Sequence, residues 1–293
     1  MTHFKTAIIA IALISNSAFA VCQNWSSKKA GTLDRRIISE ASGLTASQIK
    51  KGKLIWSNDS GGRAELYATN IAGKVERTVA LNGFSNSDYE AVASGPCVSK
   101  KSDSCIYVGD IGDGIGWRSK FKIGIFKESD FWASTSIRPE KVIEYSNGPD
   151  NSEAMVVTAD GKMIIFSKDS SGVMEVFQLT SAGKMTSLGE VNLNNIMDGA
   201  RGKGPRVTDA SLSADGKKVL LLTYGDIAEI STELLMKPSR KEWRKGVDYN
   251  VVKGPGFPQQ ETITYVTDSS FVVSTESPDG DAPEVRLYSC AKR

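Results

Sequence analysis

Histidine is almost absent from this sequence, because the single histidine, His3, lies within the first twenty residues. Those residues have the pattern of a secretion signal, in which Lys5 precedes an apolar run and small residues end at Ala20. The mature chain is therefore predicted to begin at Val21 and to contain no histidine. This excludes histidine-based triads, histidine-ligated zinc and a histidine general base. Any metal must be held by oxygen ligands, which suit calcium or magnesium.

Long apolar runs and an excess of charge of one sign are also missing. The apolar stretch within residues 1–20 is shorter than the about 20 residues that a membrane-spanning helix needs, and no later segment approaches that length. Without residues 1–20 the chain has 35 basic and 34 acidic residues. This near-neutral balance argues against nucleic acid or an anionic membrane as a partner. We expect residues 21–293 to form one domain, a monomer that is periplasmic or secreted.

Cysteine is scarce, with four residues in the chain, and four cysteines allow three pairings. In an oxidising compartment we expect a local bond between Cys97 and Cys105, and a bond from Cys22 to Cys290 that joins the two ends of the chain. Free thiols are the alternative. Either way, no chemistry has to be assigned to these residues.

A short pattern recurs five times along the chain: an acid, then a small residue or threonine, then a strand-like run. It begins at Glu40, Glu90, Glu153, Asp209 and Glu261, with spacings of 50, 63, 56 and 52 residues. A second and a third strand follow each start, and a weaker fourth strand follows the first four. Four short strands per repeat, separated by turn signals, predict an all-β chain folded as a five-bladed β-propeller.

The fifth repeat has no fourth strand of its own. The stretch "RRIIS" at Arg35–Ser39 precedes the first repeat and is expected to supply it, so that an N-terminal strand closes the ring. A bond between Cys22 and Cys290 would lock this closure. A six-bladed ring remains the alternative, if the long second repeat contains a degenerate blade around Ile111–Ser146.

Strand direction places the repeated acids at one mouth of the central channel. Neighbouring strands are antiparallel, so the start of each first strand and the end of each second strand lie on one face. Converging carboxylates repel each other unless a cation, basic partners or raised pKa values relieve them. We therefore predict a calcium or magnesium ion, with Glu40, Asp59, Glu90, Glu153, Asp209 and Glu261 as ligands. The alternative is that each acid binds backbone N–H groups of the adjacent loop and no ion.

Further candidates follow the second strands. Asp110 ends the strand in "IYVGDIGDG" and is a candidate base, whereas Asp113 is expected to shape the loop. Arg118 and Lys168 are predicted to neutralise charge on a phosphorylated substrate. Arg201, Lys203 and Arg206 in "RGKGPR" either bind an anion as well or form a solvated loop.

Several stretches resemble a family of exported bacterial propeller proteins that are largely uncharacterised. They are "NDSGG" at Asn58–Gly62, "DYEAV" at Asp88–Val92, "GDIGDG" followed by Arg118, and "TDASLSADGKKVLLLTY" at Thr208–Tyr224. The family pattern ends in "GDIGDN", where this chain has Gly114. The chain is more distantly similar to calcium-dependent apyrases, which are five-bladed propellers with a central calcium. That similarity implies phosphoanhydride or phosphoester hydrolysis by a metal-oriented water.

Three functional hypotheses result for a propeller with calcium or magnesium at one mouth and a small-molecule or protein ligand there. The first is a metal-dependent hydrolase of phosphorylated small molecules. The second is a calcium-stabilised binding or scaffold protein of the cell envelope without catalysis. The third is a glycosidase, which needs a carboxylate pair and aromatic platforms at the mouth, for which Trp117 and Tyr89 are candidates.

Overall fold

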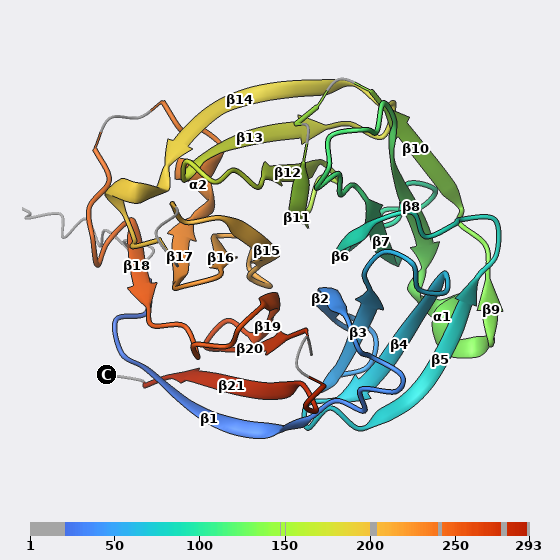
Figure 1. Cartoon of the computed structure of the whole chain (residues 1–293). Coiled ribbons are helices and arrows are strands. Elements are labelled where there is room, and N and C mark those ends of the chain that lie inside the picture. Colours follow the sequence, from blue (N-terminus) through green and yellow to red (C-terminus); the bar gives the residue numbers. More distant parts are fainter. Residues whose placement is uncertain are drawn as a thin grey trace, which may run out of the picture.

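Five antiparallel sheets surround a central channel in this computed structural model (Figure 1). The structure describes residues 21–146, 148–149, 151–199, 204–239, 242–276 and 280–291. Each sheet is one blade, and its first strand lines the channel. The innermost strands are β2, β6, β11, β15 and β19, so the chain is the predicted all-β five-bladed β-propeller.

In each blade the strands follow one another from the channel outward. Blade 1 comprises β2 (Ala41–Ala46), β3 (Lys53–Asn58), β4 (Glu65–Asn70) and β5 (Val75–Leu81), and blade 2 comprises β6 (Tyr89–Pro96), β7 (Ser104–Asp110), β8 (Phe121–Lys127) and β10 (Lys141–Tyr145). Blade 3 comprises β11 (Ser152–Val157), β12 (Met163–Ser167), β13 (Val173–Leu179) and β14 (Met185–Asn192). Blade 4 comprises β15 (Val207–Leu212), β16 (Lys218–Thr223), β17 (Ile227–Ser231) and β18 (Tyr249–Val252). Blade 5 comprises β19 (Gln260–Thr267), β20 (Ser270–Thr275), β21 (Glu284–Cys290) and β1 (Trp25–Thr32).

The long second repeat contains no sixth blade in the part of the chain that the structure describes. Its stretch Ile111–Ser146 supplies β8 and β10, the third and fourth strands of blade 2. Between them lie the short helix α1 (Glu128–Ala133) and β9 (Ser136–Ile137), which pairs in parallel with β5 and so widens blade 1 to five strands. The other short helices are α2 (Thr232–Leu235) and the 3-10 turn η1 (Leu193–Asn195).

An N-terminal strand closes the ring as predicted, but Arg35–Ser39 was the wrong segment. The closing strand is β1, which pairs antiparallel with β21 along its length. Residues 35–39 instead form a turn in which the backbone carbonyl of Asp34 accepts bonds from Ile37 and Ile38, both at 2.9 Å. The strand was missed because β1 is an outer edge strand, and most of its polar side chains face solvent and give no apolar alternation.

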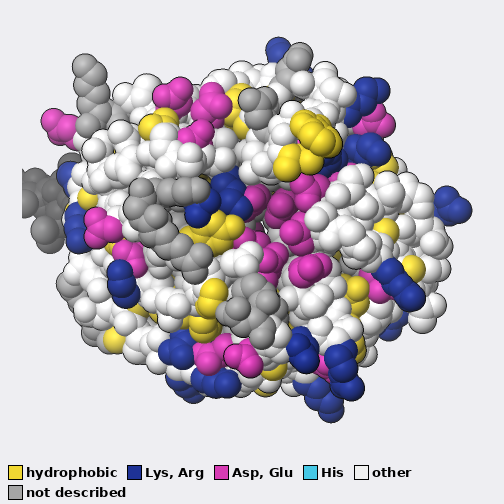
Figure 2. All heavy atoms as spheres, in the orientation of Figure 1, with side chains coloured by type: hydrophobic (Ala, Val, Ile, Leu, Met, Phe, Trp, Pro, Cys, Tyr) yellow, Lys and Arg dark blue, Asp and Glu magenta, His cyan; other side chains and the backbone are white. Residues whose placement is uncertain are grey.

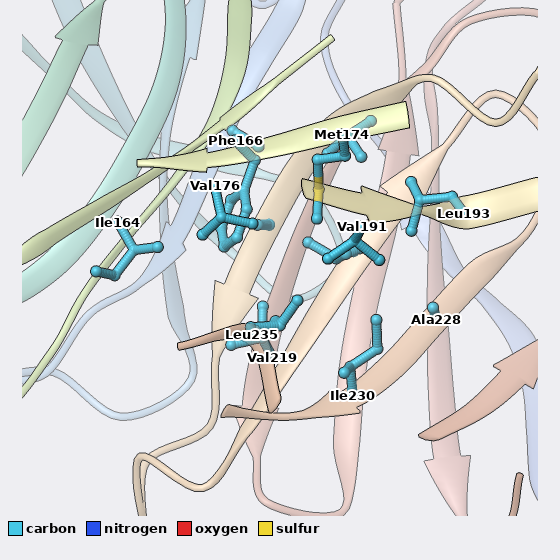
Figure 3. Close-up of a cluster of buried hydrophobic side chains, with 14 of the residues drawn as sticks. Ile164, Phe166, Met174, Val176, Val191, Leu193, Val219, Ala228, Ile230 and Leu235 are labelled. Carbon is cyan, nitrogen blue, oxygen red and sulfur yellow. The ribbon is translucent and has the colours of Figure 1, made fainter. Parts of the chain in front are cut away.

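The blades pack face to face through their apolar side chains. The second strands are buried along nearly their whole length, so they read as continuous apolar runs, and Trp56, Tyr107 and Phe166 are fully buried. Figure 3 shows the contact between blades 3 and 4, where Phe166 lies in the same cluster as Val219 and Ile230. These layers hold the inner strands at fixed positions around the channel.

Both predicted disulfides are present. Cys22–Cys290 joins the start of the described chain to the end of β21, and Cys97–Cys105 bridges the hairpin between β6 and β7. The predicted secretion signal, residues 1–20, lies outside the described residues. Within the described part, none of the helices has the length and apolar character required to cross a membrane.

The disulfide between the chain ends is expected to stabilise the fold more than the hairpin bond does. It spans 268 residues rather than 8, so it restricts the unfolded chain more strongly. Replacing both Cys22 and Cys290 by serine should lower the free energy of unfolding by about 2–5 kcal/mol. The matched control replaces Cys97 and Cys105, and urea denaturation measures both variants. A greater loss in the control would contradict this expectation.

Candidate functional site

A β-bulge near the start of the inner strands places three glutamates at one mouth of the channel. In β6 the register passes from Tyr89 to Ala91 and leaves Glu90 unpaired. The same shift leaves Glu153 unpaired in β11 and Glu261 unpaired in β19. In a β-bulge, the side chain of the extra residue points in a different direction from the regular alternation of the strand. These three predicted residues therefore occupy equivalent places, and each is nearly buried.

The other two repeated acids do not share this place. In β15 the bulge leaves Thr208 unpaired, so Asp209 lies one residue after the position that the three glutamates occupy. In β2 the shift covers Ser42 and Gly43, and Glu40 lies before the strand. Gly43 has φ 107°, and a Cβ there would lie 2.8 Å from the backbone nitrogen of the neighbouring inner strand. The repeated acids are thus out of register by one residue in blade 4 and by two residues in blade 1.

Asp209 fits the alternative in which an acid binds backbone N–H groups. It is fully buried, and its Oδ2 accepts a bond from the Ile263 amide at 2.7 Å while Oδ1 accepts one from the Ala210 amide at 2.8 Å. Burial raises the pKa of this carboxyl, and the two amide bonds oppose that rise. Glu40 is exposed, and its carbonyl accepts a bond from the Asp59 amide at 2.8 Å.

A second set of side chains reaches the same mouth from the residue after each second strand. These residues are Asp59, Lys168, Tyr224 and Glu276 in blades 1, 3, 4 and 5. In blade 2 the equivalent residue is Ile111, since Asp110 pairs with the first residue of β6. Asp110 is therefore one residue out of step with the others. Figure 2 shows Asp and Glu side chains gathered at the centre of the ring, with Lys and Arg beside them.

Six carboxylates, which we call the acidic mouth, gather at this end of the channel: Asp59, Asp88, Glu90, Glu153, Glu261 and Glu276. Within it, oxygens of Asp59, Asp88 and Glu90 all lie within 4.8 Å of one another, and these three form the carboxylate cluster. Burial and then the charge of Glu153 raise the pKa of Glu90. Burial and then Asp59 raise the pKa of Asp88 to about 6. The repeat pattern did not single out Asp88, although it precedes the inner-strand acid by two residues.

On the other side of the mouth, one lysine links the acids. Lys168 donates hydrogen bonds to Glu153 and, at 2.9 Å, to the hydroxyl of Tyr224, which in turn donates to Glu261. Burial alone would lower the pKa of the lysine, but Glu153 and Glu261 raise it above its usual value. Oε2 of Glu153 is buried without a hydrogen-bond partner among the described residues. Burial raises the pKa of Glu153 to about 8, although Lys168 opposes the rise.

Glu276 also lies on the Lys168 side of the mouth. In the sequence, the only sign of this is its position directly after a second strand. Its Oε2 accepts a hydrogen bond from the side-chain amide of Gln259 at 2.6 Å. Burial, followed by the neighbouring carboxylate of Glu261, raises the pKa of Glu276 to about 9. At neutral pH this group therefore holds a proton and the mouth carries less negative charge than its six acids suggest.

Asp110 and Arg118 hold the loop behind the mouth. Asp110 is fully buried, and its Oδ1 accepts bonds from the Asp88 amide at 2.9 Å and from Arg118 at 2.8 Å. Arg118 also donates to the carbonyl of Gly112 at 2.6 Å. Asp113 accepts bonds from the amides of Trp117 and Arg118, at 2.9 and 2.8 Å, and so shapes the loop as expected. This network positions Asp88 and leaves Asp110 enclosed.

The remaining basic and aromatic candidates have different surroundings. The guanidinium of Arg206 lies 4.6 Å from the ring centre of Tyr224, which is beside Lys168. Arg201 and Lys203 lie outside the described residues. Trp117 is 85% exposed. Tyr89, the other candidate for an aromatic platform, is buried and donates its hydroxyl to the carbonyl of Phe84 at 2.9 Å, so it offers no exposed ring face to a ligand.

Comparison with known proteins gives a structural likeness at low sequence identity. No protein-family profile matches the chain, and no curated protein matches its sequence. The PQQ-bound form of aldose sugar dehydrogenase from Streptomyces coelicolor aligns with 91% of this chain and 98% of its own, at 11% sequence identity and a TM-score of 0.46. At that identity the likeness is one of backbone arrangement.

With EDTA present, the free energy of unfolding is expected to fall as the pH rises from about 5 to about 9. The folded pKa values of Glu153 and Glu276, about 8 and about 9, lie above the ordinary glutamate value of 4.5. The folded chain therefore keeps protons that the unfolded chain has released. The stability from these groups is complete below the unfolded pKa and is lost as the pH rises through the folded values.

Glu276→Gln removes one of these groups and should make the decline with pH shallower. Urea denaturation at several pH values measures the slope, and Glu233→Gln in the exposed part of α2 is the matched control. An unchanged slope in Glu276→Gln would show that this carboxyl does not hold its proton in the folded protein.

Proposed function

We propose that this chain is an exported β-propeller that binds a divalent cation, calcium or magnesium, at the acidic mouth. The observation that supports this most directly is the carboxylate cluster, in which three acids from two blades bring their oxygens within 4.8 Å of one another. Asp59, Asp88 and Glu90 are the proposed ligands. Glu153 adjoins the cluster, and its unpartnered Oε2 is available as a fourth oxygen.

The donor set suits a hard cation. In the described part of the chain, the hydrogen bonds to Asp59 and Glu90 come from the Ser60 amide and the Ser42 hydroxyl, and no lysine or arginine forms an ion pair with the cluster. Calcium takes six to eight oxygens and includes water and carbonyl groups among them. Burial is the largest cause of the raised pKa values of Asp88 and Glu90, and repulsion from neighbouring carboxylates adds to it. A cation there would relieve that repulsion.

The two sides of the mouth have different roles in this proposal. The carboxylate cluster binds the cation, whereas Lys168 and Arg206 lie on the other side, 4.9 and 4.6 Å from the ring centre of Tyr224. Their positive charges favour an anionic group on a ligand that also meets the cation. Glu261 is already engaged by Tyr224, so it positions the tyrosine rather than the metal.

A second candidate function is hydrolysis of phosphorylated small molecules, and the pair of Lys168 and Arg206 is the observation that favours it. A bound cation would polarise a phosphoryl oxygen and a water molecule. Lys168 would neutralise phosphate charge, and Glu153, whose pKa is raised to about 8, would hold or release a proton beside it. Asp110 does not serve as the base, because it is enclosed by Arg118 and the Asp88 amide.

Cation binding without catalysis is the simpler form of the proposal, and a glycosidase is less favoured. The glycosidase hypothesis required aromatic platforms, and one of its two candidates, Tyr89, is buried against Phe84. A scaffold protein requires only the cation and the rigid ring. The choice between scaffold and hydrolase therefore depends on turnover.

Calcium at about one hundred times its dissociation constant is expected to stabilise the protein by about 2.7 kcal/mol. Thermal melts with and without EDTA, together with metal analysis of the purified protein, measure the effect. Glu90→Gln should abolish the calcium-dependent shift, since it removes a charged oxygen from the cluster. Asp103→Asn, in the hairpin between β6 and β7, is the control and should keep it. Melting that responds to neither calcium nor magnesium would falsify the proposed cation site.

Hydrolase activity is tested on a panel of nucleotides, sugar phosphates and aryl phosphates with calcium or magnesium present. If the chain is a hydrolase, Glu153→Gln should lower turnover at least 100-fold, as loss of a proton-transferring group does, while circular dichroism shows an intact fold. Lys168→Met should raise KM for the same substrate. No turnover on any substrate, together with calcium-dependent stabilisation, would leave the scaffold function.

A further inference from the structure

The end of the channel opposite the acidic mouth contains a cavity of about 250 Å³. The far ends of all five inner strands line it, so all five blades contribute to its wall. None of the residues that the proposed cation site uses is among its lining residues. Its chemistry is therefore separate from that of the acidic mouth.

One part of the cavity wall consists of hydroxyl groups held in fixed positions. Thr45 of β2 donates to Ser94 of β6 at 3.0 Å, and Ser94 donates onward to the carbonyl of Ala46 at 3.2 Å. On the other side of Ala46, whose amide donates to Thr264 at 3.1 Å, the hydroxyls of Thr264 and Ser211 are 3.3 Å apart. These pairs connect blade 1 to blade 2 and blade 4 to blade 5. Thr45 and Ser94 keep acceptor capacity beyond these bonds, because a hydroxyl oxygen has two lone pairs. Ser211 and Thr264 also accept hydrogen bonds from the amides of Tyr265 and Ala46, at 3.0 and 3.1 Å, so one of the two has both lone pairs engaged.

Leu212 of β15 and Val266 of β19 supply partly exposed aliphatic surface to the cavity. Met155 and Val157 of β11 and Leu44 of β2 adjoin it as well, but their side chains are buried and pack between the blades. None of the described lining residues is acidic, and Lys51 is their one charged side chain. The lining thus combines hydroxyl groups with aliphatic surface and very little charge.

We propose that this cavity binds a neutral saccharide. A sugar ring offers C–H surface on one side and hydroxyl edges on the other, which matches the aliphatic side chains of Leu212 and Val266 and the hydroxyls of Thr45 and Ser94. Ordinary ligand sites measure about 300–1,000 Å³. This cavity, at about 250 Å³, is slightly smaller, so it takes no more than a single sugar residue. A cation or an anion would gain little from this lining, in contrast to the acidic mouth.

The cavity continues toward the surface. A neighbouring cavity of about 390 Å³ shares Ser94, Val157 and Leu212 with it, and extends between the hairpin that carries Cys97 and Cys105 and the turn at residues 213–216. The second cavity gives a longer saccharide a path out of the channel. The saccharide site therefore accepts a terminal sugar with further residues attached.

Isothermal titration calorimetry tests the site, with EDTA present so that a metal at the acidic mouth contributes nothing. The probes are glucose, galactose, mannose, N-acetylglucosamine and the disaccharides maltose and lactose. We expect saturable binding of at least one probe. Ser94→Leu, which fills the cavity and removes a hydroxyl, should weaken that binding at least tenfold, whereas Glu233→Gln in the exposed part of α2 should leave it unchanged.

Two results overturn the proposal: the absence of saturable binding by every probe, or binding of equal strength in Ser94→Leu. If Ser94→Leu does not fold, Thr45→Val decides instead. That change keeps the side-chain shape and removes one hydroxyl, so binding should weaken in a protein whose melting temperature is little changed. Unchanged binding in Thr45→Val would then show that the hydroxyl wall does not recognise the sugar.

Discussion

The acidic mouth depends on a local feature of the backbone, the β-bulge that recurs near the start of the inner strands. A regular antiparallel strand alternates its side chains between two faces, so a single acid there would lie against a neighbouring blade or in the channel according to the register. The bulge inserts one residue and changes the direction in which its side chain points. In blades 2, 3 and 5 that residue is a glutamate. The ring then brings the three together, because β1 and the Cys22–Cys290 bond hold the first and last blades in contact.

Convergence of carboxylates creates repulsion, and the two sides of the mouth relieve it differently. On one side, Lys168 lies between Glu153 and Tyr224, and Glu276 retains a proton beside Glu261. On the other side, the carboxylate cluster has hydroxyl and amide donors but no basic side chain in an ion pair with it among the described residues. The interaction of two unit charges falls with distance and strengthens in low dielectric. The uncompensated side is therefore where an external cation gains most.

The sequence predicted the architecture better than the register. The all-β repeat, both disulfides and the acids Glu90, Glu153 and Glu261 followed from patterns with a direct physical cause. The inner strands, however, are buried along nearly their whole length, so no alternation of apolar and polar residues marks the bulges. The repeat therefore could not show that Asp209 and Glu40 are out of step with the other acids. The closing strand was missed because its side chains face solvent. Asp88 and Tyr224 were harder still to predict. Asp88 meets Asp59 of another blade only in three dimensions, and Tyr224 contributes through its hydroxyl, which donates to Glu261.

The two ends of the channel differ in chemistry although the same five strands line both. Acids lie at the strand starts, where the first bulges are, and the far ends of the same strands present small hydroxyl and aliphatic side chains to the cavity. In β19 a second register shift lies at this far end, at Val266. Charge at the acidic mouth places little constraint on a ligand at the far end, since the far cavity has no acidic lining residue among those described. The proposed cation at one mouth and the proposed neutral ligand at the other would therefore contact different residues of the ring. What they share is its rigidity, which the packed blades and the closing strand provide.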